Sequence, residues 1–225
     1  MKKIKKSRKS LSIIEKTWRF NDTVAENFDE HVNQSIPHYL DLQKYLVQLS
    51  EWFLKDEAII YDLGCSTGKT IEKILKLDIS TKFSIIGIDN SQKMLDLAKI
   101  KVDKIKNKSV NVEFQNADVT SNIKFKKANL FYSILLFPFI NLNKKKSLLK
   151  KIYKSLHTGG ALIGVEKIRS KNSNFEDILN QLYFDFKLSQ NLTEEEILSK
   201  AKSLRSSMYL SDEKTVFKTL EECGF

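Results

Sequence analysis

The sequence predicts an α/β fold in which a doubly wound, mainly parallel sheet is flanked by helices. Two observations lead to this fold class. Five short apolar runs, typical of buried strands, alternate with segments of helical period. Strands that alternate with helical segments in this way require a parallel, doubly wound sheet with right-handed crossovers. At 225 residues, the chain can bury such a core most simply as one domain.

The expected elements can be placed in chain order. A helical pattern runs from Phe20 to about Lys55, with Pro37 suited to a helix's first turn and an apolar stripe at Leu42, Leu46, Leu49 and Phe53. Alternating strands and helices follow. Strands are expected at 57–64, 82–90, 111–118, 128–137 and 161–167, and helices at 70–77, 91–105 and 143–160.

The ends of several helices have recognisable signals. Ser91 is the expected N-cap of the helix over 91–105, and the glycines at 159–160 are expected to close the helix over 143–160. After Asn174 the pattern is helical throughout. Segments 174–188 and 193–204 are amphipathic, and Ser211 or Asp212 is expected to cap a last helix that runs to Cys223.

These elements predict one domain with helical additions at both ends. Residues 1–17 form a basic arm that we expect to be disordered. Residues 18–225 form a single cofactor-binding domain. Within it, 18–55 is a helical lid, 56–170 a Rossmann-like core and 171–225 a helical region.

The composition limits the class of protein. The net charge of +10 comes mainly from lysine, with four arginines, so we interpret it as solvated lysine surface rather than a nucleic-acid site. Weak affinity for RNA or an acidic surface is the alternative. Two cysteines are too few for a metal cluster or a disulfide framework, and no apolar run approaches the roughly 18 residues of a membrane span. We therefore expect a cytoplasmic protein without a metal or a membrane partner.

The segment from Tyr61 to Thr70, YDLGCSTGKT, resembles a phosphate-binding P-loop. A P-loop needs four residues between its glycines, but only three separate Gly64 from Gly68. The alternative is an Asp-x-Gly-x-Gly-x-Gly loop, which begins at Asp62 and has Ser66 at the second glycine. Gly64 then permits the tight turn after the strand, and Gly68 lets the next helix start close to the sheet.

Two further acidic residues indicate the ligand. Asp89 ends the second expected strand, where a carboxylate can accept both ribose hydroxyls, and Asp118 ends the third, where it can meet an adenine amino group. The apolar Val119 follows. Together with Asp62, which can hold an ammonium group, the series favours S-adenosyl-L-methionine (SAM) over NAD, whose loop prefers glycine throughout.

With these residues, the chain resembles the class I SAM-dependent methyltransferases, and most closely the carboxy-SAM synthase family. The resemblance covers about Trp18 to Phe225. The glycine loop and GIDNSQKM are generic to the fold, whereas the N-terminal QSIPHY and the C-terminal DFK and MYLSDEKT are far more specific. Family members are similar in joining a carboxylate from prephenate to the SAM methyl group, for wobble-uridine modification in tRNA.

The resemblance implies a set of site residues. The cofactor would be contacted by Tyr39, Asp62, Gly64, Cys65, Ser66, Gly68, Asp89, Asn90, Asp118 and Val119. A family asparagine that touches the cofactor falls on Ile134 here. The family arginine that binds the added carboxylate falls on Lys202 or, in a less natural register, on Arg205, and a lysine there would lose the bidentate fork. Tyr39, Lys202 and Arg205 are thus the candidate catalytic residues.

The resemblance also bears on assembly. Relatives continue beyond the position of Phe225 with a hairpin that completes the sheet, so we expect a partner chain or the helical region to cover the fifth strand. A homodimer is the expected assembly. Two other functions stay open: a conventional methyltransferase acting on a small molecule or RNA, and a non-catalytic subunit that binds SAM or a partner.

Overall fold

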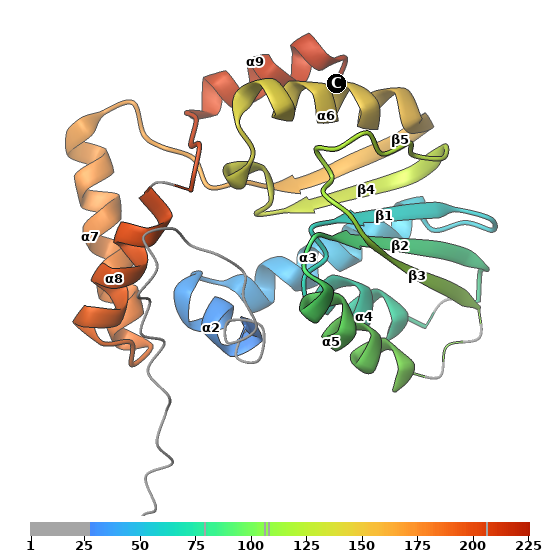
Figure 1. Ribbon diagram of the computed structural model, residues 1–225, viewed down its shortest axis with the longest axis horizontal. Helices are drawn as coiled ribbons and strands as arrows, with labels where there is room; N and C mark the ends of the chain where they lie inside the picture. Colours follow the sequence, from blue (N-terminus) through green and yellow to red (C-terminus); the bar gives the residue numbers. More distant parts are fainter. Residues whose placement is uncertain (1–27, 79, 106, 108, 206) are drawn as a thin grey trace, which may run out of the picture.

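The computed structural model describes residues 28–225, apart from residues 79, 106, 108 and 206. The expected basic arm and the start of the first helical region lie outside the described residues. Five parallel strands form one sheet in the order β3-β2-β1-β4-β5, with helices on both faces (Figure 1). The predicted α/β, doubly wound parallel sheet is confirmed.

The strands are β1 (Ile59–Leu63), β2 (Phe83–Asp89), β3 (Val110–Asn116), β4 (Ala128–Ile134) and β5 (Leu156–Val165). The helices are α2 (Phe28–Ser35), α3 (Tyr39–Ser50), α4 (Lys69–Leu75), α5 (Gln92–Asp103), α6 (Leu142–Ser155), α7 (Ser173–Ser189), α8 (Glu194–Arg205) and α9 (Glu213–Cys223). Two short 3-10 turns lie at η1 (Glu51–Phe53) and η2 (Phe137–Phe139).

The hydrophobic core has two layers, one on each face of the sheet. Helices α3, α4 and α5 cover one face, where Leu46, Ile74 and Leu95 pack with Ile60 of β1. Helices α6 and α9 cover the other, where Leu149 packs with the alternate side chains of β1. Since side chains alternate along a strand, Asp62 lies on the same face as Ile60. The strand order reverses between β1 and β4, which defines the switch point where such sheets bind ligands.

Two predicted helix caps are confirmed by their hydrogen bonds. Ser91 Oγ accepts a hydrogen bond from Met94 N at 3.4 Å, at the start of α5. Asp212, one of two candidates, caps α9 by accepting from Thr215 N at 3.2 Å. Each cap satisfies a backbone N–H that has no partner within the helix.

The prediction that glycines 159–160 close a helix was wrong. Helix α6 ends at Ser155, and β5 begins at the next residue and includes both glycines. Between Ala128 and Leu130 of β4 the pairing partner moves from Leu156 to Ala161, so β5 carries extra residues there. Gly159 has φ +78°, which suits the irregularity.

The predicted helical stripe after Pro37 was only partly right. The chain breaks at Pro37 into α2 and α3, and Leu46 is buried. Leu49, however, is 50% exposed, because α3 turns a different stripe toward the core. The buried positions of α3 are Gln43, Leu46, Val47 and Ser50.

Helices α7 and α8 form a layer beyond the carboxyl ends of β4 and β5, next to α2 (Figure 1). Among the described strands, β5 pairs only with β4, so its other edge has no strand neighbour. The switch point therefore lies between the sheet, the N-terminal helices and the α7–α8 pair.

Candidate functional site

The loop after β1 has alternating left-handed residues. Gly64, Ser66 and Gly68 have φ values of 69°, 51° and 71°. The backbone N–H groups of Gly64 and Cys65 both donate to the carbonyl oxygen of Ile88, at 2.8 and 3.0 Å, which fixes the turn to the end of β2. The predicted serine thus occupies a glycine-like conformation.

Gly68 lets the loop approach α5. A Cβ at this position would lie 2.9 Å from the Cβ of Ala98. Since real Cβ atoms do not approach so closely, any larger residue would push α4 away from α5. The sequence predicted that Gly68 lets the next helix start close to the sheet. In the structure Gly68 instead lies against helix α5.

Asp62 is buried at the switch point and lacks a complete set of partners. Its side chain is 3% exposed, and Oδ2 has no hydrogen-bond partner among the described residues. Burial raises the pKa of its carboxyl to about 7, and the charge of nearby Asp89 adds to the effect. A cationic ligand group would both pair with Oδ2 and restore the charged form, so the site fits the ammonium of SAM.

Asp89 joins the loop to the end of β2. Its Oδ2 accepts from Ser66 N and its Oδ1 from Ser91 N, each at 2.9 Å. Burial raises the pKa of Asp89, and these backbone hydrogen bonds partly offset the effect. Each carboxylate oxygen keeps a further lone pair, so the side chain can still accept ligand hydroxyls. The neighbouring Asn90 is exposed.

The third strand end is more open. Asp118 is exposed, and its Oδ1 accepts a hydrogen bond from Thr120 N at 2.7 Å. This hydrogen bond is typical of an aspartate that stabilises a turn, so it does not by itself indicate a ligand contact. Val119 is buried within the core layer that faces α6. Ile134 is half-buried at the end of β4, two residues before Leu136, whose side chain faces Gly64. The ligand contacts of these residues stay predictions.

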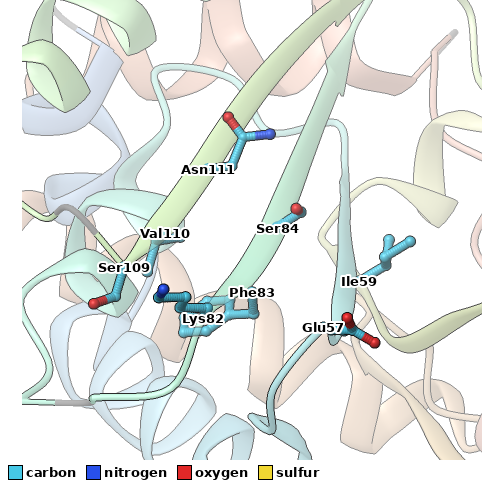
Figure 2. A pocket seen from close by; sticks show the side chains of 8 residues that line it. All are labelled: Glu57, Ile59, Lys82, Phe83, Ser84, Ser109, Val110 and Asn111. Atoms are coloured by element: carbon cyan, nitrogen blue, oxygen red, sulfur yellow. The ribbon is translucent and has the colours of Figure 1, made fainter.

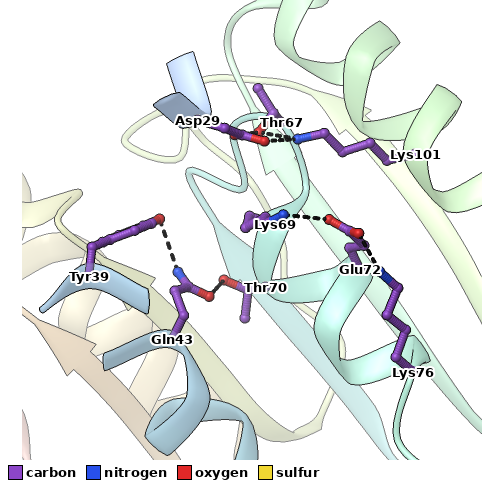
Figure 3. A network of polar contacts seen from close by, with 9 residues as sticks. All are labelled: Asp29, Tyr39, Gln43, Thr67, Lys69, Thr70, Glu72, Lys76 and Lys101. Carbon is purple, nitrogen blue, oxygen red and sulfur yellow. Dashed lines mark hydrogen bonds and ion pairs between the residues drawn. The ribbon is translucent and has the colours of Figure 1, made fainter. Parts of the chain in front are cut away.

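The N-terminal helices are anchored to the loop by polar side chains that the sequence reasoning had missed (Figure 3). Thr67 Oγ1 donates to Asp29 Oδ1 of α2 at 2.5 Å, and Lys101 of α5 pairs with the same carboxylate. Gln43 accepts from Thr70 Oγ1 at 3.2 Å. Nothing in a single sequence marks these partners, because 38 and 27 residues separate them.

Tyr39 is held over the same region by α3. Gln43 Nε2 donates to its hydroxyl at 3.0 Å (Figure 3). Burial raises the pKa of Tyr39 to about 12, so the hydroxyl keeps its proton at neutral pH. It can therefore donate a hydrogen bond to a ligand. Burial likewise raises the pKa of the Cys65 thiol, which excludes a thiolate nucleophile there.

The two candidate cations on α8 lie at the protein surface. Both Lys202 and Arg205 are exposed. The same helix instead turns Lys200 toward α2, where its ammonium contacts His31 and Ser35. Glu166, at the end of β5, forms a largely buried ion pair with Lys145 of α6, so its role there is structural.

Other kinds of site find no support in the described part of the chain. No cluster of three potential metal ligands is present there, and no described helix is long and apolar enough to cross a membrane. A pocket of about 580 Å³ lies at the amino ends of β1–β3, lined by Glu57, Phe83, Asn111 and neighbours (Figure 2). It faces the opposite end of the sheet from the switch point, so we exclude it as the cofactor site.

The fold and this switch point define a protein of the class I methyltransferase fold. Residues 60–160 match the family model described as a methyltransferase domain. Phosphoethanolamine N-methyltransferase 2 of Haemonchus contortus, solved with SAM, superimposes with a TM-score of 0.63 and 17% identity. The match covers 92% of this chain but only 42% of that protein.

Curated relatives identify the family. The carboxy-S-adenosyl-L-methionine synthase of Staphylococcus epidermidis is 34% identical over 209 residues, which cover 92% of this chain and 89% of the relative. That of Sulfurimonas denitrificans is 34% identical over 212 residues, covering 94% and 88%. The chain belongs to the carboxy-SAM synthase family. This membership confirms the expected SAM cofactor and the assignment as a SAM-dependent transferase.

Proposed function

We propose that the chain is a carboxy-SAM synthase, which joins a carboxyl group from a prephenate-like donor to the methyl carbon of SAM. The product would serve wobble-uridine modification in tRNA. The observation that carries the proposal is the similarity to carboxy-SAM synthases over nine-tenths of both chains. It extends beyond the generic core into the C-terminal helices, of which α7 and α8 lie beyond the carboxyl ends of β4 and β5 (Figure 1).

The residues of the site have distinct tasks in this proposal. Asp62 would bind the ammonium of the methionine moiety, and Asp89 would accept the ribose hydroxyls while it holds the loop. Tyr39 would close the site, and its protonated hydroxyl would donate a hydrogen bond to the substrate. The anchored helices α2 and α3 would exclude water, which strengthens each of these interactions.

The chemistry needs a carbon acid and a carboxyl donor. When bound, SAM supplies a methyl group whose hydrogens are acidified by the sulfonium. In the overall reaction this carbon would lose one proton and form one bond to the carboxyl carbon of the donor. The bond between that carboxyl carbon and the donor ring breaks, the electron pair expels the ring hydroxyl as hydroxide, and hydroxide and the methyl proton leave as water. No nucleophilic residue is required, which agrees with the protonated thiol at Cys65. Positioning in a dry pocket would supply most of the rate.

Mass spectrometry tests the proposal directly. Purified protein incubated with SAM and prephenate should convert SAM into a species heavier by one CO2, and it should do so only when prephenate is present. Protein that binds SAM but returns it unchanged would refute the proposal. Heat-denatured protein is the control for non-enzymatic decarboxylation.

Two departures from the family pattern favour a second candidate, a conventional methyltransferase. By the resemblance, the family asparagine falls on Ile134, and the arginine that binds the added carboxylate falls on Lys202 or, in a less natural register, on Arg205. Formation of S-adenosylhomocysteine with a small-molecule or RNA acceptor would support this candidate. A non-catalytic subunit would instead bind SAM or a partner without turnover. The homodimer and the cytoplasmic location stay predictions, for light scattering and cell fractionation to test.

A further inference from the structure

A group of lysines converges between α7, α8 and the end of β5. Lys187 of α7 is only 4% exposed, and its Nζ lies 3.9 Å from the ring centroid of Tyr183. Lys167, two residues beyond β5, places its Nζ 5.0 Å from the same ring. Two ammonium groups from different elements therefore share one aromatic ring. We call Lys167, Lys187 and Lys200 the lysine cluster.

Burial lowers the pKa of all three members, and repulsion by other members of the cluster adds to the effect at Lys187 and Lys200. Burial lowers the pKa of Lys187 to about 8, and Lys167 adds to the effect. Burial also lowers the pKa of Lys200 to about 7, with Lys187 and Lys167 as further causes. For Lys167, burial again lowers the pKa, while Glu176 opposes the effect. The three ammonium groups are thus close enough to repel one another.

Neither Lys187 nor Lys167 forms an ion pair with a carboxylate in the described part of the chain. The aromatic ring provides part of the compensation, since a cation over an aromatic face is stabilised. A lysine that served only to fill space would be replaced by an apolar side chain without this electrostatic cost. A buried lysine beside a half-buried one, without a carboxylate partner, instead suits a ligand that brings negative charge.

The cluster adjoins the cofactor site through two connections. Helix α2 binds the glycine loop through Asp29 and contacts Lys200 through His31 and Ser35. Lys167 follows the carboxyl end of β5, whose Val165 pairs with Ile134 of β4. An anion held by the lysines would therefore lie on the same side of the sheet as the ligand of Asp62.

We propose that the lysine cluster binds a dicarboxylate, with Lys187 and Lys167 as its main contacts. The inference rests on the proposed function, because it assigns the donor site of that reaction. One carboxylate could neutralise one ammonium group, whereas the paired lysines require two negative charges. The assignment differs from the one based on the family arginine, since Lys202 and Arg205 are exposed whereas Lys187 is buried.

Calorimetry on the SAM-saturated protein tests the site with malonate and prephenate as probes. Wild-type protein should bind both dianions, and acetate at least about tenfold more weakly. Lys187→Met and Lys167→Met should each weaken dianion binding by at least about tenfold, the effect of one charge-assisted contact. Lys187→Arg should retain most of it. The exposed Lys214→Met on α9 is the matched control and should bind as wild type does.

The variants also separate the possible outcomes. Retained SAM affinity shows that each variant is folded. Unchanged dianion affinity in Lys187→Met and Lys167→Met, loss only in Lys202→Met, or wild type that binds neither dianion would each refute the lysine cluster as the site. Conversion of SAM with an unchanged KM for prephenate in Lys187→Met would refute this inference alone. Dianion binding without conversion of SAM would refute the proposed reaction and leave the site standing.

Discussion

Asp62 combines three properties that are rarely found together in an unliganded protein. It is buried, one of its oxygens has no partner among the described residues, and a second carboxylate, Asp89, lies near enough to repel it. Such an arrangement costs stability and gains from a bound cation. This arrangement is what the proposed contact of Asp62 with a cationic ligand group requires.

The raised pKa of Asp62 predicts how stability depends on pH. In the unfolded chain the carboxyl titrates near 3.8, and in the ligand-free fold it titrates at about 7. The folded state thus holds an extra proton between these values, and stability falls as pH rises through this window. The loss is on the order of 4 kcal/mol at 1.36 kcal/mol per pKa unit.

An asparagine at this position separates folding from binding. Ligand-free Asp62→Asn should be more stable than wild type at pH 8.5, and the difference should shrink toward pH 4, because asparagine does not ionise. Its SAM affinity should fall by about 10- to 100-fold, the effect of one charge-assisted hydrogen bond. Urea denaturation across this pH range and calorimetry with SAM measure the two effects. A variant less stable than wild type at pH 8.5 would contradict the assignment.

The glycine loop shows how one element depends on particular residues. Gly68→Ala combines a left-handed conformation, with φ +71°, and a contact of 2.9 Å with Ala98. We expect it to lose about 2–5 kcal/mol of unfolding free energy. Ser66→Gly should stay within about 1 kcal/mol of wild type, since relief of its φ of 51° offsets the added freedom of the unfolded chain. Urea denaturation of both variants checks the contrast, and equal losses would contradict it.

The sequence predicted the strands well because buried parallel strands are continuous apolar runs with a local signal. It failed at glycines 159–160, since the same pair suits a helix end or an irregular strand, and only the pairing with β4 decides between them. It also failed to mark Lys187. In a lysine-rich chain each lysine resembles a solvated residue, and its burial arises only when α7 packs beside α2 and α8.

The cofactor loop could also be predicted from the sequence, because its signal is local. Its glycines and aspartates carry conformational and chemical requirements that few other residues meet. The anchors of α2 and α3, such as Asp29 and Gln43, carry no such requirement and depend on contacts between distant segments. Local chemistry therefore identified the ligand, whereas tertiary contacts were needed to build the rest of the site.

At the scale of the whole molecule, side-chain contacts join helix α2 both to the loop after β1 and to helix α8. A ligand that binds only the folded state stabilises all of these elements together. At 100 times its dissociation constant, SAM should add about 2.7 kcal/mol to the unfolding free energy. For a chain of this length, that corresponds to a rise of about 5–10 °C in Tm.

Differential scanning fluorimetry of protein purified without ligand, measured with and without added SAM, gives this rise in Tm. Two comparisons show which residues cause it. NAD at the same concentration should shift Tm by less than about 1 °C, because the loop has Ser66 and Asp62 where a pyrophosphate would need glycine and no negative charge. Asp62→Asn should lose most of the SAM-induced shift while its ligand-free Tm at pH 8.5 exceeds that of wild type. If Asp62→Asn kept the full SAM-induced shift in Tm, the ammonium of SAM would have to bind at another residue. Equal shifts with SAM and NAD would show that the loop selects for adenosine alone, and would contradict the assignment of the methionine ammonium to Asp62.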